Sequence, residues 1–336
     1  MKAVWFIVSM LSCTAARAQG VPAIPFTASA PLQLPKDVYL GEATGVAVNA
    51  KGHVYVLSRG NTSGPAYAAA AAQLLEFDAQ GKFVREIGKH LYAWSFGHTV
   101  RVDPQQNIWV TDKGSDMVVK FDPQGRVAMV FGRKQEASDE DTAPLKHPSP
   151  PLPAEDGRFR QVTDVAFGPD GSAFISDGYI NSRVAKVGKD GAWLKSWGDR
   201  GNRRIQVFDG NGTFLRMFTI DVPYDQGARP AIGNVPNVAK IEASGGAKTM
   251  LPGSPWTVCI TPGPNQVLYA SDAFPGRIYK LTLDGKVLGY LGESGKQLKQ
   301  FGWVHEIACP SENVLYVAEL LNWRVQRLVL HPQGAQ

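Results

Sequence analysis

Two histidines at matching positions of a repeated sequence unit are the residues of this chain best suited to bind a metal ion. Five segments of one type begin at Thr44, His98, Thr163, Trp256 and His305. If these segments surround a common axis, their first residues form a ring at which His98 and His305 meet, and such a ring is a usual place for a ligand. Neutral imidazole is a common zinc ligand. The competing interpretation is that each histidine is only a polar surface residue at the start of a strand.

A second set of polar residues follows the second strand of each unit. An acid recurs there at Asp112, Asp177, Asp272 and Glu319. We expect this acid to accept hydrogen bonds from backbone N–H groups in the turn. Arg59 and Tyr179 depart from the repeat pattern on the same rim. An arginine is well suited to holding a carboxylate, so this rim is a candidate binding site.

The repeated unit is clearest in residues 159–198. Four short runs rich in β-branched and aromatic residues alternate there with turn sequences at 169–171, 177–178 and 189–191. Four strands and three tight turns in about 40 residues are typical of one antiparallel propeller blade.

Copies of this unit cover most of the chain. The first strand pair recurs at 44–58, 98–112, 163–177, 256–272 and 305–319, and the second at 74–88, 117–132, 182–198, 202–218, 276–292 and 323–330. These five first halves and six second halves predict an all-β propeller with six blades, of which the fourth is incomplete. The missing first half would belong between Arg200 and Gly201. A five-bladed ring with an extra hairpin is the structural alternative.

The last copy lacks its final strand. A closed ring needs that strand, because an open sheet edge is left unpaired otherwise. We expect residues 19–43 to supply it, from 32–34 or 38–40. The propeller would then span 44–330, followed by a tail at 331–336.

The first residues have the pattern of a signal peptide. Lys2 precedes an apolar run, and the small residues Ala16 and Ala18 favour cleavage before Gln19. Residues 1–18 are therefore set apart from the fold, and the protein is expected to be exported to the periplasm or the exterior, with no transmembrane segment. Lipid attachment at Cys13 is a less favoured alternative, because the residues before it match lipoprotein processing poorly.

The remaining composition argues against nucleic acid as a partner and leaves the state of two cysteines open. Removing Lys2 and Arg17 from the 35 basic residues leaves 33 against 30 acidic residues, a net charge of +3 that is too small and too scattered to indicate nucleic acid. Cys259 and Cys309 form either a disulfide or two buried thiols on neighbouring strands. We expect a monomer.

The strand pairs resemble NHL repeats, which form six-bladed propellers. More specifically, residues 163–184 resemble a blade of the peptidyl-α-hydroxyglycine α-amidating lyases, in which a tyrosine follows the same Asp-Gly pair and precedes Asn-Ser-Arg. Arg59, His98 and His305 match the arginine and two of the zinc histidines of that family. Glu306 matches an acid, usually aspartate, that helps to hold a structural calcium ion there.

This resemblance implies a zinc ion held by three histidines, with a peptidyl-α-hydroxyglycine as substrate and a peptide amide and glyoxylate as products. Tyr179 would be the base and Arg59 would orient a substrate oxygen. The middle histidine would belong to the half blade that this chain lacks, so the resemblance leaves enzymatic activity open. The alternative function is a non-catalytic propeller that binds a peptide, protein or glycan in its channel or on its loops.

Overall fold

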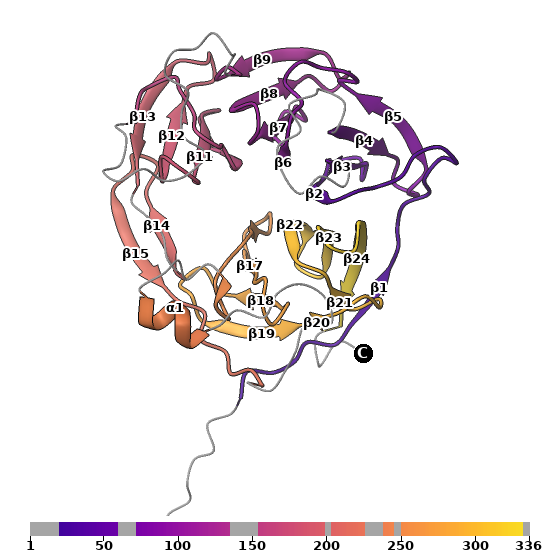
Figure 1. Cartoon of the computed structure of the whole chain (residues 1–336), viewed down its shortest axis with the longest axis vertical. Coiled ribbons are helices and arrows are strands. Elements are labelled where there is room, and N and C mark those ends of the chain that lie inside the picture. The colour runs from indigo at the N-terminus through magenta and orange to yellow at the C-terminus, as the bar shows by residue number, and fades with distance from the viewer. Residues whose placement is uncertain are drawn as a thin grey trace, which may run out of the picture.

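The strands form four-stranded antiparallel sheets arranged around a central channel (Figure 1). The computed structural model describes residues 20–59, 72–134, 154–198, 203–225, 238–244 and 250–331. The expected signal peptide at 1–18 and the junction of Arg200 with Gly201 lie outside these residues. No helix in the described ranges is long and apolar enough to cross a membrane.

The first three blades follow one another along the chain. Blade one contains β2 (Ala43–Val48), β3 (Val54–Ser58), β4 (Gln73–Phe77) and β5 (Phe83–Ile87). Blade two contains β6 (Gly97–Val102), β7 (Ile108–Asp112), β8 (Met117–Phe121) and β9 (Val127–Phe131). Blade three contains β10 (Asp164–Phe167), β11 (Ala173–Asp177), β12 (Arg183–Val187) and β13 (Trp193–Trp197).

A two-stranded hairpin and two further blades complete the ring. The hairpin is β14 (Ile205–Phe208) with β15 (Phe214–Phe218), and the next blade contains β16 (Val258–Ile260), β17 (Leu268–Ser271), β18 (Ile278–Leu281) and β19 (Val287–Leu291). The closing blade contains β22 (Val304–Ser311), β23 (Val314–Glu319), β24 (Arg324–Leu330) and β1 (Phe26–Ser29). The remaining elements are α1 (Val238–Ser244) and the short parallel pair β20 (Glu293–Ser294) and β21 (Gln300–Phe301).

The prediction of six blades is wrong, and the alternative of five blades with an extra hairpin is confirmed. The described residues form five four-stranded sheets, and β14 pairs only with β15 among them. Figure 1 shows this hairpin at the periphery between β13 and β19, in the place of the outer half of a blade. This hairpin is the extra second half found in the sequence at 202–218. It packs against the β16–β19 blade through a cluster that includes Ile205 and Phe218.

Tight turns with a recurrent acid connect the third and fourth strands of the blades. Asp78 and Asp122 each accept two backbone N–H bonds from their own turn. Gly81 and Gly125 follow with φ angles of 80° and 84°, which residues with a side chain rarely adopt. The Asp-x-x-Gly turns of the sequence thus fix the spacing of the strands.

Apolar clusters between neighbouring blades make up the core. The largest buried side chains between blades one and two include Leu57, Leu74 and Phe121, and those between blades two and three include Phe159 and Ile175. Side chains alternate along each strand, so each sheet contributes one face to the cluster on either side. This packing holds the inner strands in place around the channel.

The N-terminal segment completes the closing blade through β1. Phe26 pairs with Leu330 and Ser29 with Arg327, in antiparallel register. The structure uses this strand in place of the expected 32–34 or 38–40, because Gln33 instead bridges to Lys82 of blade one and Val38 and Leu40 pack against its core. Hence the segment ties the closing blade to blade one.

A disulfide joins Cys259 of β16 to Cys309 of β22. It connects the inner strands of two neighbouring blades across a sequence separation of 50 residues. Of the two alternatives for these cysteines, the structure therefore has the disulfide.

The closing strand leads to a prediction about Phe26, whose ring stacks on Phe301 at a centroid distance of 6.5 Å. Phe26→Ala should lower the free energy of unfolding by about 2 kcal/mol, less than for a fully buried phenylalanine because part of its ring is exposed. Tyr39→Ala is the matched control in the same segment, since Tyr39 is 78% exposed and should matter little. Denaturant unfolding of both variants measures this, and equal losses would contradict the role of β1.

Candidate functional site

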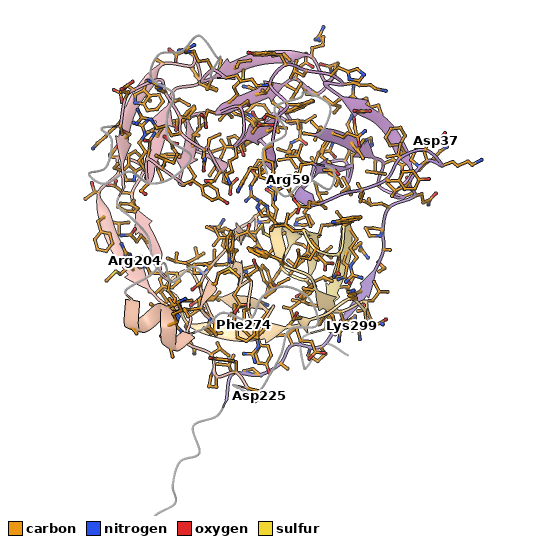
Figure 2. All side chains as sticks on the ribbon, viewed as in Figure 1. Asp37, Arg59, Arg204, Asp225, Phe274 and Lys299 are labelled. Atoms are coloured by element: carbon orange, nitrogen blue, oxygen red, sulfur yellow. A yellow bond between two sulfur atoms is a disulfide. The ribbon has the colours of Figure 1, made fainter. Side chains whose placement is uncertain are left out.

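The site lies at one end of the channel, where the starts of the inner strands meet the loops that follow the second strands. Figure 2 shows Arg59 at the inner rim of the ring. In blades one and two and in the closing blade, the register of the innermost strand shifts at the ring position, next to Thr44, His98 and His305 respectively. A bulge re-aims the side chain of the residue at which it occurs. The same local irregularity thus orients both histidines.

The two histidines contact each other directly. Their ring centroids are 4.5 Å apart with an interplanar angle of 61°. Nδ1 of His98 lies 2.8 Å from the Thr163 carbonyl oxygen, and Nδ1 of His305 lies 2.7 Å from that of Thr44. Because a carbonyl oxygen can only accept, each Nδ1 donates its proton and each Nε2 keeps its lone pair. The Nε2 atom of His98 is buried and has no hydrogen-bond partner among the described residues.

Both imidazoles are held in the neutral form. Burial lowers the pKa of His98 well below its usual value, and the neighbouring His305 and Arg59 lower it further. Burial also lowers the pKa of His305 to about 4, and the charge of Arg59 adds to this effect. Two neutral imidazoles with available Nε2 atoms can act as metal ligands near neutral pH.

Arg59 and Tyr179 lie beside the histidines, as the sequence predicts. The Tyr179 ring contacts that of His98 edge to face, at a centroid distance of 5.8 Å. Nε of Arg59 donates to Glu42 at 2.6 Å, and the guanidinium carbon lies 3.8 Å from the centroid of Phe96. Burial raises the pKa of Tyr179, and the charge of Arg59 opposes that shift. The structure therefore brings four of the five predicted site residues to one rim.

These residues fit a zinc ion only in part. His98 and His305 supply two nitrogen ligands, and the backbone carbonyls behind them fix their orientation. No cluster of three or more histidine, cysteine or acidic residues suited to a metal occurs in the described ranges. His53 binds Glu76, His331 contacts Thr27 and His90 is exposed in the turn after β5, whereas His147 is outside the described residues. The third ligand implied by the resemblance is thus not found in the described part of the ring.

Glu306, the fifth predicted residue, belongs to a separate ion network inside the ring. Its side chain is fully buried, and its Oε2 accepts from the backbone N–H groups of Val46 at 2.8 Å and Val100 at 3.1 Å. Its Oε1 lies 3.0 Å from Nε of Arg101. Gly45 allows this approach, because a Cβ there would lie 2.7 Å from the Glu306 carboxylate.

The guanidinium group of Arg101 lies among the oxygens that could hold a calcium ion beside Glu306. Its guanidinium donates two hydrogen bonds to Asp164, at 2.9 and 2.7 Å, and a third to the Ile307 carbonyl oxygen at 3.3 Å. Together with Glu306, this set of a buried carboxylate, a second carboxylate and a carbonyl is what calcium prefers. Because the guanidinium already engages these oxygens, the residues do not fit a calcium ion.

The recurrent acid has the structural role expected of it. Asp112 accepts from the backbone N–H groups of Ser95, Phe96, Gly114 and Ser115. Asp272 accepts in the same way from Gly253, Gly276 and Arg277. Each acid thus ties the loop that precedes the inner strand to the loop after the second strand, which positions the rim.

Sequence reasoning missed two residues of the rim, Lys113 and Phe96. Nζ of Lys113 lies 3.9 Å from the centroid of the Tyr179 ring and 5.4 Å from that of Phe96. Lys113 occupies the repeat position that corresponds to Arg59 and Gly178, one residue after the acid Asp112 and one before the position of Tyr179. That shared position was the signal that could have identified it.

No known family profile matches the chain. The peptidyl-α-hydroxyglycine α-amidating lyase 1 of Drosophila melanogaster is 24% identical over 291 residues, which cover 75% of this chain and 47% of that protein. A probable lyase of the same name from Caenorhabditis elegans is 28% identical over 167 residues, covering 45% and 43%. The peptidylglycine α-amidating monooxygenase of Rattus norvegicus is 28% identical over 182 residues, covering 48% and 17%. The chain thus spans about half or less of the length of these relatives.

Solved structures share the fold. A streptogramin B lyase superposes with a TM-score of 0.53 at 13% identity, covering 91% of this chain and 98% of that one. A gluconolactonase from Xanthomonas campestris superposes with a TM-score of 0.52 at 14% identity, covering 92% and 99%. At this identity the likeness concerns the fold alone.

The fold and the rim define an all-β propeller with a histidine-containing site at one end of its channel. Among propellers, this chain is similar to the peptidyl-α-hydroxyglycine α-amidating lyases.

The ion network predicts that Arg101 is needed for stability. Burial raises the pKa of Glu306 to about 8, and Arg101 opposes that shift. Arg101→Gln removes this counter-charge and the guanidinium bonds to Asp164 and Ile307, and should lower the free energy of unfolding by about 3 kcal/mol. Arg126→Gln is the control, because Arg126 also pairs with an aspartate but is 77% exposed on its side chain, and should change little. Urea unfolding measures both.

The same network predicts that wild-type protein is insensitive to calcium. Its melting temperature should not change when millimolar calcium or a calcium chelator is added. A melting temperature that rises with calcium and falls with the chelator would contradict the conclusion that these residues do not fit a calcium ion.

Proposed function

We propose that this protein is a lyase that cleaves a peptidyl-α-hydroxyglycine into a peptide amide and glyoxylate. The observation that carries the proposal is the pair of neutral histidines, His98 and His305, with Nε2 atoms available beside Tyr179 and Arg59. The similarity to proteins named as such lyases supports it.

Zinc is the proposed cofactor, held by His98 and His305. When bound, zinc lowers the pKa of a hydroxyl group that coordinates it. Two protein ligands hold zinc less firmly than the three of most catalytic sites, so we expect the protein to need added zinc for full occupancy.

The protein's own residues supply the proton transfer and orientation. Tyr179, as phenolate, accepts the proton of the substrate hydroxyl; burial opposes that form and the charge of Arg59 favours it. The bond between the amide nitrogen and the α-carbon then breaks, the carbon–oxygen double bond of glyoxylate forms, and the nitrogen takes up a proton. Arg59, fixed by Glu42 and Phe96, orients a substrate oxygen.

Export belongs to the same proposal. The signal-peptide pattern of residues 1–18 supports it. So does the Cys259–Cys309 disulfide, because such bonds persist in oxidising compartments.

A second candidate function is binding without catalysis, of a peptide, protein or glycan. It is favoured by the two-stranded sheet β14–β15. A four-stranded blade at this place would have an inner strand, and that strand would supply a ring residue between those of blade three and the β16–β19 blade.

An assay of glyoxylate release distinguishes the two functions. Wild-type protein with zinc should convert N-benzoyl-α-hydroxyglycine to benzamide and glyoxylate in equal amounts. Tyr179→Phe should lower kcat by about 100-fold, because it removes the proton acceptor. Tyr92→Phe is the control, since Tyr92 is 54% exposed and outside the site. If wild-type protein releases no glyoxylate at any zinc concentration, the lyase proposal fails and the binding function remains. If wild type is active and Tyr179→Phe equals it, Tyr179 is not the base.

A further inference from the structure

Lys113 places a positive charge at the rim without an acidic partner. Its backbone N–H donates to the Phe96 carbonyl oxygen at 3.1 Å, which fixes the start of the loop between β7 and β8. Its ammonium group lies over the faces of Tyr179 and Phe96. Within the described ranges, no carboxylate forms an ion pair or hydrogen bond with it. A partly buried cation of this kind has lost hydration that only an anion would fully replace.

A second cation lies close to Lys113. Arg59 lies over the same Phe96 ring, and its Nε pairs with Glu42. Burial and the charge of Arg59 lower the pKa of Lys113 to about 8. Two cations close together form a site for a negatively charged ligand.

We propose that Lys113 is a carboxylate-binding residue of this site, and that the ligand is a small acid or a peptide whose terminal carboxylate lies next to the reacting carbon. The ammonium group donates to the carboxylate, while the rings of Phe96 and Tyr179 restrict water around the pair. Tyr179 contacts both Lys113 and His98, so a carboxylate on Lys113 places the adjoining carbon on the histidine side of the rim.

The inference rests on the proposed function for the site and for the reacting carbon. Binding of the carboxylate to Lys113 requires no turnover and is tested without it. For the proposed reaction, Lys113 would select substrates with a free terminal carboxylate over their amides. If instead Lys113 only packs on the two rings, its charge is dispensable and its apolar stem is sufficient.

The test measures by calorimetry the equilibrium binding of two unreactive probes that differ in charge. They are N-benzoylglycine, an acid, and N-benzoylglycinamide, its neutral amide. Neither probe has the hydroxyl group that cleavage requires. Wild-type protein should bind the acid at least about tenfold more tightly than the amide. Lys113→Met keeps the apolar stem and removes the charge, so it should abolish this preference, whereas Lys113→Arg should retain it.

Lys120→Met is the matched control. Lys120 is in the same blade and also lies over an aromatic ring, 5.1 Å from the centroid of Trp109, but it has Asp103 within 3.9 Å. This variant should bind both probes as wild type does. Thermal unfolding of each variant shows whether it is folded.

Each outcome decides the inference. A wild-type protein that does not prefer the acid overturns it without any variant, and so does a folded Lys113→Met that retains the preference. If the acid is preferred through Lys113 but no glyoxylate is released in the lyase assay, the carboxylate site stands and the proposed reaction fails. If Lys113→Met releases glyoxylate with the same KM as wild type, the carboxylate site is contradicted, whereas the proposed reaction stands.

Discussion

The structure depends most on the buried ion network around Arg101. Its guanidinium extends from the inner strand of blade two to Asp164 of blade three and to Glu306 of the closing blade, and Glu306 also accepts from Val46 of blade one. Four inner strands are therefore fixed to one another by a single set of charges. A buried charge that loses its partner is costly, so these strands have little freedom to move apart. The histidines are carried on the same strands, next to these residues.

That network explains how the ring tolerates an incomplete position. The contacts among blades one, two and three and the closing blade do not involve the hairpin β14–β15. On the other side, the disulfide and the apolar cluster around Tyr269 and Ile307 hold the β16–β19 blade to the closing blade. The hairpin keeps the outer circumference continuous by packing on the β16–β19 blade. The candidate site therefore has one ring residue fewer, because the inner strand that would supply it is not among the described elements.

Local patterns made much of this predictable from the sequence. Turn residues and alternation located the strand pairs, and the shared ring position located His98 and His305, because these features depend on near neighbours in the chain. Three features could not be found in this way. The identity of the closing strand was missed because several short apolar pieces precede blade one, and only packing against Phe301 selects Phe26. Arg101 was missed because its partners Asp164 and Glu306 come from other blades. The contact of Lys113 with Tyr179 was missed because Tyr179 belongs to blade three, although the repeat position of Lys113 is visible in the sequence.

The central claim is that a two-histidine site, held by the inner strands, binds one metal ion. Its most direct test is the zinc content of purified protein after equilibrium dialysis against a range of free zinc concentrations, with wild type compared with His98→Ala and His305→Ala. The account predicts one zinc ion per wild-type chain, and loss of that ion in either variant while the fold is retained. Zinc that remains bound in both variants, or a wild-type chain that takes up none, would contradict it.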